Sequence, residues 1–251
     1  TLLLSGGVHG DEYEGPITLG RLLRDTDPAQ VQGRLIFIPA ANLAAVQAGM
    51  RTSPLDGKNM NRTFPGDAGD TPTSQISHYM ESVLFPMADL FMDLHSGGSS
   101  LDLLPAPIMQ WDPEDDEQRK KTEAVFKAIN AELTVAMDTM GESRTSTAGA
   151  IRQGCVVVGT ELGCRGAVTR PGLDLAERVV RNTLTHMGVM EFPKSEEPPS
   201  KPGRFTVIKD TKSYVFAPHP GIWESFHELG DEVQAGDAAG CTHFLDDPGR
   251  E

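Results

Sequence analysis

Four short apolar runs, each followed by a turn rich in glycine, asparagine or histidine, constrain the fold of this chain more than any other feature. The runs are Thr1–Leu4, Leu35–Pro39, Leu90–Leu94 and Cys155–Leu162. Helix-like stretches lie between and after them, at Pro16–Arg24, Ser74–Met87, Asp115–Leu133 and Leu173–Met187. Strands that alternate with helices predict an α/β fold, with a mostly parallel sheet covered by helices on both faces.

The α/β pattern runs to about residue 190, and a proline-rich segment follows it. Residues 193–202 hold four prolines together with charged side chains, which predicts a linker. Beyond it, Arg204–Ile208, Tyr214–Phe216 and Ile222–Phe226 are short strand candidates separated by Gly, Pro and Asp. We therefore predict a main domain at 1–192, a linker at 193–202 and a small all-β appendage at 203–251.

The chain is acidic, with 22 basic and 36 acidic side chains and a net charge of −14. Nucleic-acid affinity depends on a basic surface, so we expect no DNA or RNA partner. No apolar run reaches the length of a transmembrane helix, so we also expect no membrane partner. The sequence does not decide between a monomer and a homo-oligomer.

The number and spacing of the cysteines indicate the cellular compartment. Cys155, Cys164 and Cys241 are an odd number without a C-x-x-C pair, which predicts neither a disulfide framework nor a thiolate zinc site. We therefore expect a cytoplasmic protein. Thr1 already lies inside a strand-like run, and we expect no signal peptide in this chain.

The first apolar run ends in a turn that contains His9 and Glu12. Three residues apart, an imidazole and a carboxylate can converge on one ion, and nitrogen with oxygen ligands suits Zn²⁺. The alternative is an ordinary polar turn, because H-x-x-E occurs by chance in many proteins. The glycines around the pair permit unusual backbone conformations and favour the metal interpretation.

His95 follows the third apolar run in the same way, at the start of a glycine turn. In open α/β sheets ligands bind at the carboxyl edge, so His9, Glu12 and His95 can meet there. Two nitrogens and a carboxylate leave one tetrahedral position open, as in catalytic zinc sites. Asp93 could orient the His95 imidazole or be an ordinary polar strand residue, and the sequence leaves both open.

The fourth apolar run places Glu161 at the same carboxyl edge of the predicted sheet. A glutamate that ends an apolar strand is often only an exposed terminal charge. Beside a zinc site, however, a carboxylate can take a proton from water and return it to a leaving nitrogen.

A basic segment follows the second run. Residues 31–65 hold four basic side chains and one acid, and Arg51, Asn61 and Arg62 lie within this stretch. The arginine fork matches a carboxylate and asparagine adds amide donors, so the segment indicates an anion pocket. The alternative is a solvated basic loop.

Four ordered segments, G-x-H-G-D-E, N-x-N-R-x-F-P-G, D-L-H-S-G and T-E-L-G, together resemble the succinylglutamate desuccinylase/aspartoacylase family over about residues 1–190. The resemblance implies a zinc carboxypeptidase-like fold and one zinc ion per chain. Its zinc ligands map onto His9, Glu12 and His95. The segment at 51–66 is most similar to the N-acetyl-diaminobutyrate deacetylases of that family.

The same resemblance implies roles for the remaining site residues. Glu161 matches the catalytic glutamate, and Asn61 with Arg62 matches the pair that holds a substrate carboxylate. Arg51 matches the arginine that polarises the scissile carbonyl, with a spacing that varies in the family. The expected activity is zinc-dependent hydrolysis of the amide bond in a small N-acyl amino acid.

The sequence leaves two other functions open. One is a metallocarboxypeptidase that acts on peptides, and the other is a non-catalytic small-molecule binding protein.

The tail at 219–236 is similar to biotinyl/lipoyl-like β modules, but no lysine occupies the carrier turn. We therefore expect a structural cap or an assembly surface there. The histidines outside the motifs show no ligand spacing and are expected to be ordinary residues: His78, His186, His219, His227 and His243.

Overall fold

The computed structural model describes residues 1–137, 142–163, 165–192, 203–247 and 249. The chain forms two compact units, Thr1–Ile208 and Lys209–Glu251. Within the described residues, every helix is too short or too polar to cross a membrane.

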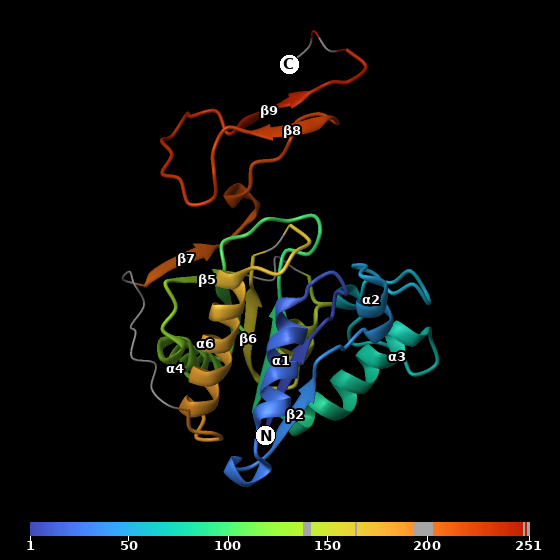
Figure 1. The fold of residues 1–251 in the computed structure, drawn as a ribbon, viewed down its shortest axis with the longest axis vertical. Helices are drawn as coiled ribbons and strands as arrows, with labels where there is room; N and C mark the ends of the chain where they lie inside the picture. Colours follow the sequence, from blue (N-terminus) through green and yellow to red (C-terminus); the bar gives the residue numbers. More distant parts are fainter. Residues whose placement is uncertain (138–141, 164, 193–202, 248, 250–251) are drawn as a thin grey trace. The chain divides into compact units, whose positions relative to one another are not determined.

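The first unit is built on a seven-stranded sheet with the order β2-β1-β3-β6-β4-β5-β7 (Figure 1). Its strands are β1 (Leu2–Gly6), β2 (Leu35–Ile38), β3 (Leu90–His95), β4 (Ala106–Met109), β5 (Leu133–Met137), β6 (Val156–Glu161) and β7 (Arg204–Ile208). Every neighbouring pair is parallel except β4 with β6, which is antiparallel. The mostly parallel sheet confirms the predicted fold class.

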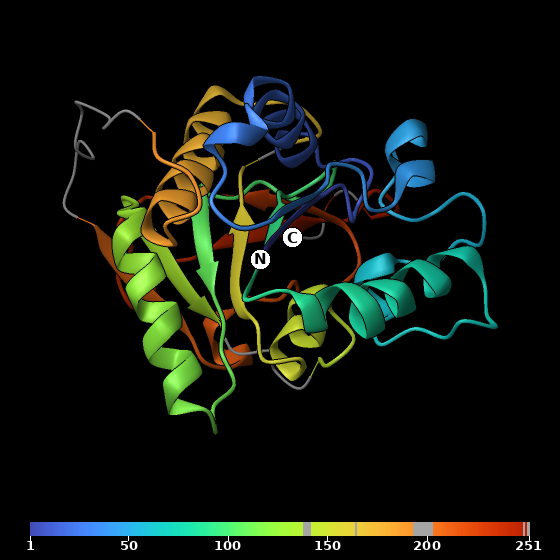
Figure 2. The same cartoon turned by 90° about the horizontal axis from the view of Figure 1, so that it is seen from below.

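Helices cover both faces of this sheet. They are α1 (Glu14–Asp25), α2 (Leu43–Ala48), α3 (Pro72–Tyr79), α4 (Asp116–Ile129), α5 (Ser146–Arg152) and α6 (Arg170–His186). The helices α1, α4 and α6 pack on one face, and α5 packs on the other (Figure 2).

The alternation of side chains along the central strands explains the two layers. In β3, Leu90 and Met92 belong to the core beneath α1, α4 and α6, whereas Phe91 belongs to the core on the opposite face. The valines of β6 divide in the same way, with Val157 on the side of Phe91. A strand buried on both faces needs a continuous apolar run, which is why these strands were visible in the sequence.

Three expected elements differ from the structure. The helix expected at Ser74–Met87 is α-helical only to Tyr79 and continues as a π turn and a 3₁₀ turn. The helix expected to reach Leu133 ends at Ile129, because Asn130 takes the left-handed conformation and closes α4. The expected strand Tyr214–Phe216 is wrong, since these residues form no strand pairing.

The appendage was expected to start at residue 203, but in the structure the second unit starts one strand later. Arg204–Ile208 forms β7, which pairs parallel with β5 as the last strand of the main sheet. The second unit accordingly begins at Lys209, and the predicted linker at 193–202 lies outside the described residues. The second unit contains a short antiparallel pair, β8 (Ile222–Ser225) with β9 (Gly240–His243).

Candidate active site

The seven residues predicted for the site line one cavity of about 360 Å³ at the carboxyl ends of β1, β3 and β6. They are His9, Glu12, Arg51, Asn61, Arg62, His95 and Glu161. Because β1, β3 and β6 are neighbours and parallel, their carboxyl ends reach the same edge of the sheet. The topology therefore brings together residues that are far apart in the sequence, at the place where α/β proteins bind ligands.

The turn after β1 depends on two glycines. Gly7 has a φ of 68°, in the left-handed region that other residues avoid. A Cβ at Gly10 would lie 2.0 Å from the backbone of Ala45 in α2. The close approach of this turn to α2 fixes the path of the segment that carries His9 and Glu12.

Two histidines and one glutamate of the cavity lining converge on one another. His9 Nδ1 lies 2.7 Å from Glu12 Oε1, and His95 Nδ1 lies 2.7 Å from Glu12 Oε2. Their exposed fractions are 2%, 3% and 9% for His9, Glu12 and His95, respectively. Their nitrogen and carboxylate donors lie within 4.8 Å of one another, which is the arrangement that a divalent ion requires.

The outer nitrogen of each imidazole has its own partner. His9 Nε2 lies 3.0 Å from Asn59 Oδ1, and His95 Nε2 lies 3.0 Å from Asp93 Oδ2. An acceptor at Nε2 can hold a proton there, so that Nδ1 can exchange its hydrogen bond to Glu12 for a metal ion, as metal-binding histidines do. The residues present therefore fit a zinc ion at this position. Of the two roles left open for Asp93, this contact matches the orientation of His95.

The electrostatics of the cluster are consistent with a cation site. Burial alone would raise the pKa of Glu12, but the charge of His95 and the hydrogen bonds with both imidazoles hold it well below its usual range. Burial would likewise lower the pKa of His95, whereas Asp93 and Glu12 raise it well above the ordinary value. The buried carboxylates of Glu12 and Asp93 thus stabilise a positive charge on the His95 imidazole that lies between them.

Glu161 ends β6 in register with His95 of the neighbouring strand. Burial raises its pKa to about 8, although the charge of His95 acts in the opposite direction. Its Oε2 atom is buried and has no hydrogen-bond partner among the described residues. A carboxyl group that faces a cavity without a partner is available to a bound molecule or ion.

Arg51 reaches the cluster from the segment after α2. Its Nη1 donates to Glu12 Oε1 over 3.3 Å, and its side chain remains partly exposed. A guanidinium in this position places donors beside the imidazole and carboxylate cluster.

Asn61 and Arg62 belong to a short 3₁₀ turn, Met60–Arg62, and line the same cavity. Ser146 at the start of α5 donates its backbone N–H and its hydroxyl to Asn61 Oδ1, at 2.9 and 3.2 Å. The Ser146 hydroxyl also contacts Asp93 Oδ2. Arg62 Nε lies 3.3 Å from Glu142 Oε2. The turn is thus tied to α5 on one side and to Glu142 on the other.

Sequence reasoning missed three residues that support this site, namely Asn59, Ser146 and Glu142. Asn59 lies inside the N-x-N-R segment, where an acceptor for His9 could have been sought. Ser146 and Glu142 stand in a stretch that carries no motif. Nothing in the local pattern around them indicates a contact with the turn at Asn61 and Arg62.

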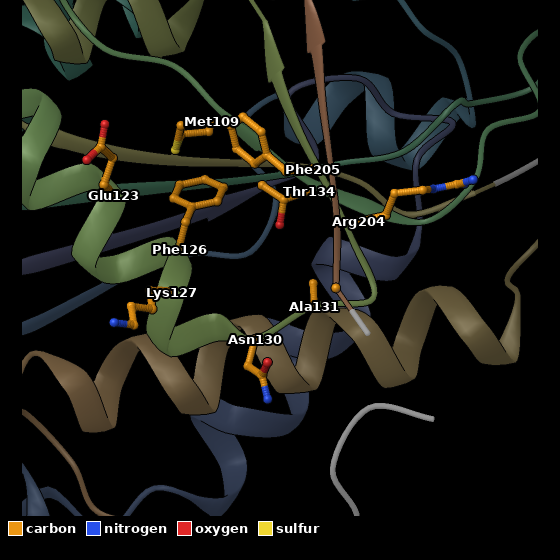
Figure 3. A pocket seen from close by; sticks show the side chains of 10 residues that line it. Met109, Glu123, Phe126, Lys127, Asn130, Ala131, Thr134, Arg204 and Phe205 are labelled. Carbon is orange, nitrogen blue, oxygen red and sulfur yellow. The ribbon is translucent and has the colours of Figure 1, made fainter. Parts of the chain in front are cut away.

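A second cavity, of about 420 Å³, lies under α4 and beside β5 and β7 (Figure 3). Figure 3 shows Met109, Phe126 and Phe205 gathered in it, with charged side chains such as Lys127 farther out. Its lining contains none of the predicted site residues. The chemistry of the first cavity therefore distinguishes it as the candidate active site.

The chain matches a known protein family over most of its length. The family described as "Succinylglutamate desuccinylase/Aspartoacylase catalytic domain" matches residues 1–187. The chain is similar to the N-alpha-acetyl-L-2,4-diaminobutyric acid deacetylase of Halomonas elongata, with 39% identity over 94% of this chain and 68% of the relative.

Two solved structures share the fold closely. One is a succinylglutamate desuccinylase/aspartoacylase from Rhodobacter sphaeroides, with 39% identity and a TM-score of 0.88 over 98% of this chain and 74% of that one. The other is the product-bound ectoine utilization protein EutE (DoeB) of Ruegeria pomeroyi, with 35% identity and a TM-score of 0.90 over 100% of this chain and 75% of that one. This chain belongs to the succinylglutamate desuccinylase/aspartoacylase family.

Proposed function

We propose that this protein is a zinc-dependent amide hydrolase that removes the acyl group from a small N-acyl amino acid. The observation that carries the proposal is the convergence of all seven predicted site residues on one cavity. Its volume of about 360 Å³ lies near the lower end of the range for small-molecule sites, which favours a small substrate over a peptide.

His9, Glu12 and His95 would hold the zinc ion through Nδ1, carboxylate and Nδ1 donors. When bound, zinc would polarise the scissile carbonyl and lower the pKa of the attacking water. The contacts from Asn59 and Asp93 keep both imidazoles in the orientation that this requires.

Once a cation bound at the ligand cluster favours its ionised form, Glu161 would accept a proton from the attacking water and return it to the departing amine. Its place opposite His95 at the end of β6 puts its carboxylate beside the ligand cluster, and its Oε2 is unpartnered among the described residues. Arg51, which reaches Glu12 Oε1, would donate to the carbonyl oxygen as negative charge develops on it.

Asn61 and Arg62 would bind the substrate carboxylate. The Asn61 oxygen already accepts two hydrogen bonds from Ser146, so its amide nitrogen is the atom suited to a carboxylate. Anchoring that carboxylate fixes the distance of the acyl group from Glu161, which is catalysis by positioning.

The names of the relatives suggest the first substrate to test. The Halomonas elongata relative is named for N-α-acetyl-L-2,4-diaminobutyric acid, and we propose the same compound or a close analogue for this chain. The cytoplasm is the compartment we propose, in keeping with the thiol state of Cys155 and Cys241.

The test measures metal content and amine release on the untagged chain, purified without a chelator. The substrates are acetyl, succinyl and formyl amino acids, beginning with N-α-acetyl-L-2,4-diaminobutyrate, together with peptides that have free carboxyl termini. We expect amine release from the N-acyl amino acids, its loss with a chelator and its recovery with Zn²⁺.

Glu161→Gln is the variant that separates chemistry from metal binding. We expect it to keep its zinc while its turnover falls by about 10²–10⁴-fold, the usual contribution of a positioned general acid–base group. Cleavage of the peptides alone would identify a carboxypeptidase. Absence of both metal and hydrolysis would identify a binding protein.

A further inference from the structure

Three side chains with metal-binding chemistry meet on the two-stranded sheet of the second unit. Glu224 of β8 pairs in register with Cys241 of β9, and His243 follows Cys241 by two positions. Side chains alternate across a strand, so Cys241 and His243 share a face, and Glu224 is their cross-strand neighbour on that face.

The donor atoms of these side chains converge on one point. Cys241 Sγ lies 3.4 Å from His243 Nε2 and 3.6 Å from Glu224 Oε2, and His243 Nε2 lies 2.5 Å from Glu224 Oε2. Tetrahedral zinc with bonds of about 2.0–2.3 Å separates its ligands by roughly 3.5 Å. Both sulfur distances already match that separation. Only the distance between His243 Nε2 and Glu224 Oε2 must increase for an ion to bind among the three donor atoms.

The charge of the group also suits a cation. The hydrogen bond from His243 lowers the pKa of Glu224, and the contact with Cys241 lowers it further. The carboxylate is therefore an anion at neutral pH. A carboxylate, an imidazole and a thiol together offer oxygen, nitrogen and sulfur donors, which suit Zn²⁺ and Co²⁺ better than Mg²⁺ or Ca²⁺.

The second unit has little apolar burial to stabilise it. Among its described residues Thr242 is the buried side chain, and no hydrophobic side chain is buried. Ile222 and Trp223 of β8 are 54% and 44% exposed. Small units of this kind commonly use a metal or a disulfide to join their strands.

We propose that Glu224, Cys241 and His243 form a second metal site, for a thiophilic divalent ion such as Zn²⁺, which joins β8 to β9. The three protein ligands leave the fourth position to water. This site differs from the His9, Glu12 and His95 cluster in one chemical respect, because it contains a thiolate. Its existence does not depend on the hydrolase function.

Cobalt distinguishes the two sites. The first cluster has only nitrogen and oxygen donors, so a thiolate-to-Co²⁺ charge-transfer band in the near ultraviolet reports on the second site alone. The experiment titrates the metal-stripped, untagged full chain with Co²⁺ and follows that band. We expect the band in the wild type and in His95→Ala, and its loss in Cys241→Ser and His243→Gln.

Matched controls use the other two cysteines. Cys155→Ser and Cys164→Ser should keep the band, since neither residue belongs to the group. Circular dichroism of each variant verifies that the chain remains folded. A wild-type protein without the band, or a band that persists unchanged in Cys241→Ser, overturns the proposal.

Hydrogen exchange tests whether the ion joins the strands. At a free Zn²⁺ concentration about ten times Kd, linkage predicts about tenfold slower exchange of the β8 and β9 amides that open when the site breaks. We expect this protection in the wild type and not in Cys241→Ser. Equal exchange with and without Zn²⁺ in the wild type contradicts the joining role.

Discussion

Asn59 Oδ1 lies 3.0 Å from Nε2 of His9, a residue 50 positions earlier in the chain. The same oxygen accepts a hydrogen bond from the backbone N–H of Asn61 over 2.9 Å. One side chain thus orients a proposed metal ligand and also holds the turn that carries Asn61 and Arg62. The proposed metal cluster and the proposed carboxylate pocket are positioned by a shared atom.

Asn59→Ala should weaken zinc binding by about 10–100-fold, because the His9 imidazole loses the acceptor that fixes its orientation. It should also raise KM, since the turn at Met60–Arg62 loses its cap. Competition with a fluorescent zinc chelator measures the first effect. Asn59→Asp keeps an acceptor oxygen and is the control, so equal losses in both variants would contradict the orienting role.

Arg62→Lys should raise KM for an N-acyl amino acid with little change in kcat. Lysine keeps the charge but not the planar fork, and a hydrogen bond to a charged group contributes about 1.5–3 kcal/mol, or roughly 10–150-fold in binding. Steady-state kinetics measure the two constants separately. Arg21→Lys is the matched control, because Arg21 pairs with Glu177 outside the cavity. An unchanged KM would remove Arg62 from the carboxylate pocket.

Ser146→Ala should lower the free energy of unfolding by about 1–3 kcal/mol, because the buried Asp93 carboxylate loses the Ser146 hydroxyl, while Asn61 Oδ1 keeps the backbone N–H of residue 146. Thr183→Val is the contrasting variant. The Thr183 hydroxyl is buried on α6 without a hydrogen-bond partner among the described residues, so its removal should be neutral or stabilising. Urea denaturation measures both, and equal destabilisation by the two changes would contradict the argument.

Cys155 should resist alkylation in the folded protein. Its thiol donates to the carbonyls of Phe85 and Ala88, and burial, with the charge of Asp89, raises its pKa from 9.0 to about 11. Two pKa units reduce the thiolate fraction at pH 8 by about 100-fold. Peptide mass spectrometry after iodoacetamide treatment gives the rate at Cys155, and labelling at the rate of the unfolded chain would contradict this prediction.

The same shift predicts the direction of a pH effect on stability. Below pH 9 the thiol is protonated in both the folded and unfolded chain, so it contributes no pH dependence. Between pH 9 and 11 only the unfolded chain releases the proton readily, so stability falls. The fall in the denaturation midpoint over this range should be larger in the wild type than in Cys155→Ala.

The sequence could predict the central strands because their burial leaves a continuous apolar run. The strands β1, β3 and β6 are covered on both faces, and each run ends where the strand reaches the site. The strand β4 carried no such signal. It has four residues, includes Pro107 and lies between β6 and β5, where only tertiary pairing makes it a strand.

The residues of the candidate site could be predicted from the sequence to a similar extent as the strands. The proposed metal ligands and Glu161 could be predicted because each follows an apolar run. The structure brings these side chains together in one cavity. Their roles stay predictions. Ser146 was not visible, because its contact with Asn61 joins residues 85 positions apart. The Glu224, Cys241 and His243 group was missed for the same reason, since strand pairing and not spacing brings Glu224 to the other two.

The antiparallel direction of β4 has a consequence for the wall above Glu161. Since β4 begins at the edge where β3 ends, and β6 lies between them, the connection at 96–105 must arch over the end of β6. Gly97 donates its N–H to Gly163 O over 2.7 Å, and Leu101 lines the cavity. Such a bridge can change length or side chains without shifting any strand. The part of the cavity wall that Leu101 forms is therefore set by a surface connection and not by the sheet beneath it.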